Sequence, residues 1–100
     1  MSVMMVMKVQ ADSDAFRSYM DSHAAEMQQL SEDAKSQGGI HHRFAIGDGF
    51  LLAIDEWESA DAFMSFFEGN EAVAAAMQAA GAQGEPEISI GEAIDAPSNY

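Results

Sequence analysis

The sequence predicts an α+β fold in which four antiparallel strands form one sheet and two helices cover one of its faces. Three observations predict it. Short apolar runs are bounded by glycine, proline and polar residues, as strands are. Between these runs, two longer segments repeat apolar residues at intervals of three and four, as amphipathic helices do. The chain has 100 residues, of which 48% are hydrophobic, enough for one domain with a thin core.

The first half of the chain predicts a strand followed by a helix. The strand covers Val3–Val9, and Asp12 or Ser13 offers an N-cap for the helix that follows. Gly38 and Gly39 end that helix. The residues expected on its apolar face are Phe16, Met20, His23, Met27, Leu30 and Ala34.

A hairpin follows, and a second helix and a last strand complete the domain. The hairpin strands are Ile40–Ile46 and Phe50–Trp57, joined by a three-residue turn, Gly47–Gly49. Ser59 caps the second helix, which is interrupted at Gly69 and recapped by Asn70. The last strand is expected over Glu87–Ile94, after Pro86. This strand–helix–strand order, repeated once, is the ferredoxin-like βαββαβ arrangement. We therefore expect one domain over residues 1–95 and a tail over residues 96–100.

Charge and composition exclude several classes of function. The chain has 4 basic and 17 acidic residues and a formal net charge of −13, so we expect no nucleic acid and no anionic membrane as partner. With no cysteine, a thiol nucleophile and a cysteine zinc site are excluded. No apolar stretch approaches the roughly 20 residues of a membrane span. The apolar run at the N-terminus is too short to be the hydrophobic region of a signal peptide. We expect a cytoplasmic, acidic protein.

The strands predict a homodimer. In a two-layer domain the sheet face away from the helices meets water, so its strands should alternate apolar and polar residues. Val3–Met7 and Phe50–Ile54 are instead apolar on both faces. The chain has no third helix to cover the second face, and a second copy of the sheet is the simplest cover.

The hairpin brings together the candidate catalytic residues. With a three-residue turn, His41 lies opposite Asp55, with Arg43 beside them, on the face expected to look away from the helices. A slip of one residue would set His42 against Asp55, so either histidine is a candidate partner. A histidine held by a carboxylate is a competent general acid or base, and Arg43 is placed to hold an anionic oxygen. The alternative is a cross-strand ion pair that only stabilises the fold.

Further residues are candidates for a pocket that takes a small hydrophobic or aromatic ligand. They are His42, Trp57, His23, Tyr19 and Phe66. Phenylalanines at helical spacing more often belong to the core, and a histidine on an apolar helix face is more often structural. Neighbouring histidines on a strand point to opposite faces, so His41 and His42 cannot readily share a metal. We expect neither a metal nor another cofactor.

Two segments carry a resemblance to a known family. They are Gly39–Phe44, a strand led by glycine, and Ile54–Phe63, a strand that runs into a helix. Together with the βαββαβ order, they resemble the dimeric α+β barrel superfamily and, within it, the antibiotic-biosynthesis-monooxygenase-like proteins. In that family an acidic residue often lies two positions before an aromatic residue and a helix cap follows. Asp55, Trp57 and Ser59 stand at those positions here.

The resemblance implies a function as well as a fold. It implies a cofactor-independent monooxygenase, or an acid–base catalyst, acting on an aromatic or polyketide-like substrate. Such monooxygenases need no metal because an electron-rich substrate carbanion reduces oxygen directly. The alternative is a non-catalytic dimeric module that binds a metabolite or responds to stress. The sequence departs from the family at two places: many members have a histidine near Phe66 or Phe67 and an asparagine at the position of Ile40.

Overall fold

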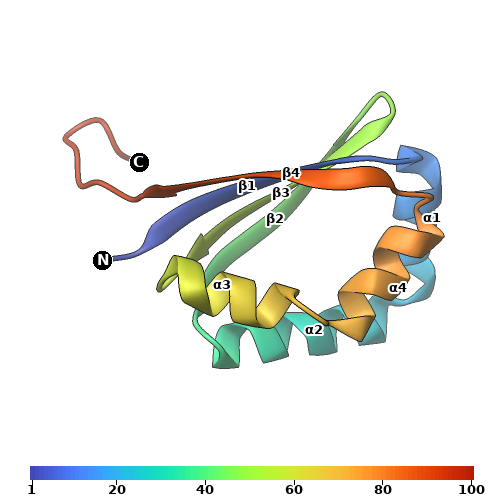
Figure 1. The fold of residues 1–100 in the computed structure, drawn as a ribbon, viewed down its shortest axis with the longest axis horizontal. Coiled ribbons are helices and arrows are strands. Elements are labelled where there is room, and N and C mark those ends of the chain that lie inside the picture. The colour runs from blue at the N-terminus through green and yellow to red at the C-terminus, as the bar shows by residue number, and fades with distance from the viewer.

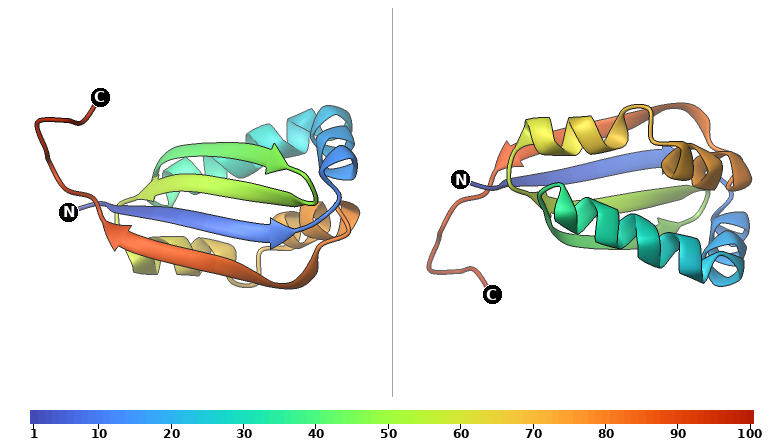
Figure 2. Two further views of the ribbon diagram at one scale, coloured as in Figure 1. Left: turned by 90° about the horizontal axis from the view of Figure 1, so that it is seen from above. Right: turned by 90° about the horizontal axis from the view of Figure 1, so that it is seen from below.

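The computed structural model describes residues 1–100, and it confirms the predicted α+β fold. A single four-stranded antiparallel sheet has the strand order β2-β3-β1-β4. All the helices lie on one face of this sheet, and the other face is open (Figures 1 and 2). The elements in chain order are β1 (Val3–Gln10), α1 (Ser13–Ser22), α2 (Ala24–Ser36), β2 (Gly39–Gly47), β3 (Phe50–Trp57), α3 (Ala60–Phe67), α4 (Glu71–Ala79) and β4 (Gln83–Glu92).

The first predicted helix is two helices, which corrects the expectation of a single one. The break is at His23, whose φ of −123° and ψ of 36° are not helical. Its ring stacks on Tyr19 with centroids 3.9 Å apart, and its Nδ1 lies 3.2 Å from the Tyr19 carbonyl oxygen and 2.8 Å from Ser22 Oγ. These local contacts compete with regular helix geometry. The change of direction lets α2 run beneath β2 instead of continuing past the end of the sheet (Figure 2).

The predicted interruption of the second helix is confirmed. Gly69 has a φ of 68°, in the left-handed region that favours glycine. Asn70 Oδ1 then accepts hydrogen bonds from the backbone N–H groups of Ala72 and Val73 and caps α4.

The hairpin turn is one residue shorter than predicted. Gly47 pairs with Phe50, so only Asp48 and Gly49 lie between the paired residues, and Gly49 takes a φ of 81°. The pairing that follows sets His42 against Asp55, the alternative register, so the expectation of His41 opposite Asp55 is wrong. Because strand side chains alternate, this slip reverses the expected orientation of the whole of β3 relative to β2.

The last strand also differs from its prediction, since it begins at Gln83 and ends at Glu92. The register of β1 against β4 shifts between Lys8 and Gln10. The irregularity falls in the stretch of β4 that holds Gly84, with a φ of 72°, and Pro86. A bulge on an edge strand tolerates a proline, which lacks the N–H that a regular ladder needs. Beyond β4 the C-terminal tail leaves the sheet and then turns back on itself (Figure 1), with the Asn99 N–H donating to the Ala96 carbonyl oxygen.

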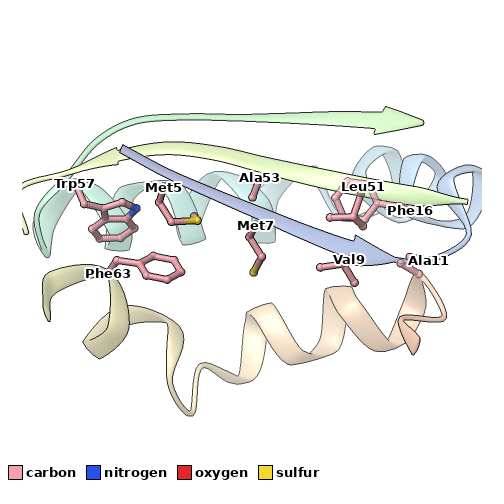
Figure 3. Packing of buried hydrophobic residues seen from close by; sticks show 10 residues of the cluster. Met5, Met7, Val9, Ala11, Phe16, Leu51, Ala53, Trp57 and Phe63 are labelled. Atoms are coloured by element: carbon pink, nitrogen blue, oxygen red, sulfur yellow. The ribbon is translucent and has the colours of Figure 1, made fainter. Parts of the chain in front are cut away.

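The core lies between the helices and the sheet. Met5, Met7 and Val9 of β1 are buried there beside alternate residues of β3 (Figure 3). The buried β3 residues are Leu51, Ala53, Asp55 and Trp57. The sequence predicts that Asp55 faces away from the helices, and this prediction is wrong because the observed register turns Asp55 toward them.

The open face of the sheet keeps large apolar side chains in contact with solvent. Met4 is 43% exposed, Val6 42% and Ile54 39%. The pairings Met4–Glu56 and Val6–Ile54 place these side chains together on that face. No helix is both long enough and apolar enough to span a membrane.

Candidate functional site

A cavity of about 600 Å³ lies between the helices and the sheet. Of the 23 residues that line it, 16 are hydrophobic. Strands β1, β2 and β3 form its roof, α2 forms one wall, and α3 and α4 form the other. The lining includes the apolar residues Met5, Met7, Phe63, Phe66, Phe67 and Met77. A mostly apolar cavity with a few polar groups is typical of a small-molecule site.

The polar groups in the wall of this cavity centre on Asp55. Asp55 belongs to the buried face of β3, and the residue is only 6% exposed. Both carboxylate oxygens have partners: His42 Nδ1 lies 2.6 Å from Oδ1, and Trp57 Nε1 donates to Oδ2 over 3.0 Å. A buried carboxylate with both oxygens engaged is held in one orientation.

The strand geometry explains why these three residues meet. His42 and Asp55 are paired across the hairpin, and side chains of paired residues lie on the same face. Trp57 is two residues beyond Asp55 on β3, so its side chain points the same way. Its indole packs against Phe63 and Phe66 of α3, with ring centroids at 5.7 and 5.3 Å.

The Asp55 contact determines which nitrogen of His42 is free. An ionised carboxylate only accepts hydrogen bonds, so Nδ1 carries the proton and donates to it. In the neutral imidazole, Nε2 then holds a lone pair and can accept a proton. The ring also meets Phe44 edge to face at 4.4 Å, and its side chain is 42% exposed. Chemically, this is an oriented base beside an apolar cavity.

The structure brings some of the predicted site residues together and separates others. His42, Asp55, Trp57 and Phe66 line the cavity. Arg43 pairs with Ile54 on the open face of the sheet and does not line the cavity. The prediction that Arg43 lies on the same face as Asp55 is therefore wrong. His41 borders the cavity but pairs with Glu56.

The two predicted pocket residues of the first helix lie elsewhere. Tyr19 and His23 are absent from the lining of the cavity and stack on each other at the break between α1 and α2. No group of three or more His, Asp or Glu side chains is arranged to hold a metal ion.

Three lining residues of α2 were not predicted as part of the site. Gln28, Ser31 and Lys35 border the cavity, although they lie off the apolar stripe of the helix. Their spacing of three and four residues puts them along one side of α2, and this was the available signal. Because these three side chains are polar, the sequence instead predicts that they face solvent.

Comparison with known proteins identifies the fold. No protein-family model matches the chain, and no curated protein matches its sequence. Among solved structures, SnoaB, a cofactor-independent oxygenase from Streptomyces nogalater, is 18% identical, with 98% of each chain covered and a TM-score of 0.63. The chain has the fold of the antibiotic-biosynthesis-monooxygenase-like proteins.

Further solved structures agree with this assignment. A putative antibiotic biosynthesis monooxygenase from Deinococcus radiodurans is 16% identical, with 98% of each chain covered and a TM-score of 0.59. Another from Bordetella bronchiseptica is 10% identical, with 93% of this chain and 97% of that chain covered and a TM-score of 0.64. The fold and its topology are therefore shared despite low identity.

Proposed function

We propose that this protein is a homodimeric, cofactor-independent monooxygenase that acts on a small aromatic or polyketide-like molecule bound between the helices and the sheet. The observation that carries the proposal is the His42–Asp55 pair, 2.6 Å apart, in the wall of a mostly apolar cavity. The likeness in fold to SnoaB, a cofactor-independent oxygenase, supports the same class of reaction. Fold alone does not select a chemistry, so the site carries the argument.

The chemistry needs a base, an apolar pocket and dioxygen. His42 Nε2 takes a proton from an acidic CH₂ group of an electron-rich aromatic substrate such as an anthrone. The resulting carbanion passes electrons to dioxygen, and a carbon–oxygen bond forms to give a peroxide anion. The imidazolium of His42 returns its proton to this anion, which gives a hydroperoxide and regenerates the base. Loss of water from the hydroperoxide leaves a carbonyl group. In sum, CH₂ and O₂ become C=O and H₂O: one oxygen atom enters the product and the other leaves as water.

The protein contributes orientation and charge to this sequence. The Asp55 carboxylate keeps His42 in the tautomer that exposes Nε2 and stabilises the imidazolium formed by proton transfer. The phenylalanine and methionine side chains hold a flat substrate and exclude water, which would otherwise protonate the carbanion. An apolar cavity also suits dioxygen, an uncharged and apolar co-substrate.

Oxygen uptake with anthrone as the probe substrate tests the catalytic part. The His42→Gln variant is expected to lose at least about 100-fold in kcat, the range of general-base catalysis. His41→Gln is the matched control, because it removes the neighbouring histidine, which pairs with Glu56 and not with Asp55. Asp55→Asn is also expected to abolish turnover. Equal rates for wild type and His42→Gln would exclude His42 as the base.

The homodimer rests on the open face of the sheet. Met4, Val6 and Ile54 are each about two-fifths exposed there, an apolar patch that soluble proteins usually cover. A second copy of the same face is the simplest way to cover this patch, because a twofold interface buries the same patch of both copies against each other. Sedimentation at micromolar concentration is expected to give a dimer for wild type and a monomer for Ile54→Lys. A wild-type monomer would contradict this part of the proposal.

A second candidate is a dimeric module that binds a metabolite without changing it. The observation in its favour is the number of methionines in the lining, since flexible methionine side chains adapt to varied planar ligands. They are Met5, Met7, Met20, Met27 and Met77. On this alternative, wild type binds aromatic probes without oxygen uptake, and His42→Gln binds them with unchanged affinity.

A further inference from the structure

We infer that the ligand enters the cavity as an uncharged aromatic molecule, with its ionisable proton still in place, and that a molecule bearing a carboxylate is rejected. This inference rests on the proposed function, because it concerns the same cavity. It narrows the ligand class from aromatic molecules in general to neutral phenols, enols and anthrone-like compounds. Three features of the charge distribution carry it.

The first feature is the fixed negative charge in the wall. Asp55 is 6% exposed, and water therefore screens its carboxylate little. If His42 is protonated, its charge lies 2.6 Å from that carboxylate, and the pair together contributes no net positive charge. An entering anion thus meets either a net negative or a neutral pair.

The second feature is the position of the basic residues. The chain has 4 of them against 17 acidic residues. Lys35 borders the cavity, but its Nζ is 3.3 Å from Glu32 Oε1, and both side chains are 67% exposed. Lys8 and Arg43 lie on the open face of the sheet, and Arg17 is exposed on α1 outside the lining. A carboxylate inside the cavity would lose its water without gaining a buried cation.

The third feature is the charge balance of the proposed reaction. When a neutral substrate gives its proton to His42, the substrate becomes negative and the imidazole positive, so the total charge of the site is unchanged. A substrate that already carries a carboxylate would become a dianion beside Asp55. The net charge of −13 adds a long-range repulsion for anions that salt weakens.

A pair of probes of similar size tests the inference. They are 2-naphthol, which is neutral at pH 7, and 3-hydroxy-2-naphthoate, which carries a carboxylate. Isothermal titration calorimetry at low and high salt measures the Kd of each. We expect the carboxylate to bind at least about 10-fold more weakly, because a buried carboxylate without a partner loses more than the roughly 1.4 kcal/mol that a tenfold change represents. Added salt is expected to strengthen only the anionic probe.

Three variants of α2 sharpen the test. Ser31→Arg places a guanidinium at the cavity and is expected to bring the affinity for the carboxylate up to that for the phenol. Ser36→Arg is the matched control, because it adds the same charge to α2 at a residue outside the lining and is expected to leave the preference unchanged. Lys35→Gln removes the one basic residue that borders the cavity. Because Lys35 Nζ already faces Glu32 and both side chains are 67% exposed, we expect this variant to weaken binding of the carboxylate only slightly.

The outcomes separate this inference from the proposed function. Weaker binding of the carboxylate, relieved by Ser31→Arg and not by Ser36→Arg, supports the inference. Tighter binding of the carboxylate, lost in Lys35→Gln, overturns it and leaves the aromatic-binding function standing. If neither probe binds wild type at millimolar concentration, the cavity is not an aromatic site. The proposed function then fails, and this inference fails with it.

Discussion

Replacing Trp57 with phenylalanine tests whether the indole N–H holds the buried carboxylate in place. Phenylalanine keeps an aromatic ring between Phe63 and Phe66, whose centroids lie 5.7 and 5.3 Å from that of the indole. It removes the donor that lies 3.0 Å from Asp55 Oδ2. Since Asp55 is only 6% exposed, water does not easily replace that donor.

The expected loss has two parts. A hydrogen bond to a charged group contributes about 1.5–3 kcal/mol to stability. Trp57 is 2% exposed, so the smaller phenylalanine ring leaves a cavity in the core. This cavity lowers the free energy of unfolding by about 1 kcal/mol more. The free energy of unfolding should therefore fall by about 2.5–4 kcal/mol, which in a domain of this size lowers Tm by at least about 10 °C.

A double-mutant cycle separates the two parts. Urea unfolding followed by circular dichroism is measured for Trp57→Phe, Asp55→Leu and the double variant, all at one protein concentration. In the Asp55→Leu background the indole N–H has no carboxylate to bind, so Trp57→Phe should cost only the packing part. An equal loss in both backgrounds would refute the reasoning and assign the whole effect to ring packing.

Three further changes test the local structure by thermal unfolding. Asp12→Ala should lower the free energy of unfolding by about 1 kcal/mol, because Asp12 Oδ1 accepts hydrogen bonds from the N–H groups of Asp14 and Ala15 at 3.0 and 3.1 Å. Asp12→Asn should keep most of that stability, and an unchanged Tm in Asp12→Ala would contradict the cap. Asn70→Ala should cost a similar amount at the start of α4, with Asn70→Asp as the variant that keeps the cap. Gly49→Ala should cost about 1 kcal/mol through its φ of 81° alone, since a Cβ there meets no atom within 4 Å; a stabilised variant would contradict this assignment.

Local signals in the sequence predicted most of the elements. Asp12 and Asn70 mark helix starts because their side chains cap free N–H groups, and the structure has both caps. The break at His23 was missed, since His23 continues the helical spacing of Phe16 and Met20. Its cause is stacking on Tyr19 and contact with a carbonyl oxygen, neither of which changes an apolar pattern.

The candidate site shows the same division. The sequence identified Asp55 and a neighbouring histidine as a pair, because turns of two and of three residues through Gly47–Gly49 both set a histidine opposite Asp55. It did not identify which histidine, because turns of two and three residues both suit that glycine-containing segment. The cavity wall contributed by α2 was not predicted either, because Gln28 and Lys35 are polar and their spacing fits a solvent face equally well.

By itself, then, the sequence determined the order of the strands and helical segments, the caps at Asp12, Ser59 and Asn70, and the excess of apolar residues on both faces of the strands. These follow from local chemistry and from periodicity, which are properties of neighbouring residues. Only the tertiary structure decided that His42 faces Asp55 and that Asp55 lies beneath the helices. The physical reason is that side chains on a strand alternate, so one residue in the turn exchanges the two faces. A β3 that is apolar on both sides permits either choice, and packing of Trp57 against Phe63 and Phe66 accompanies the one adopted.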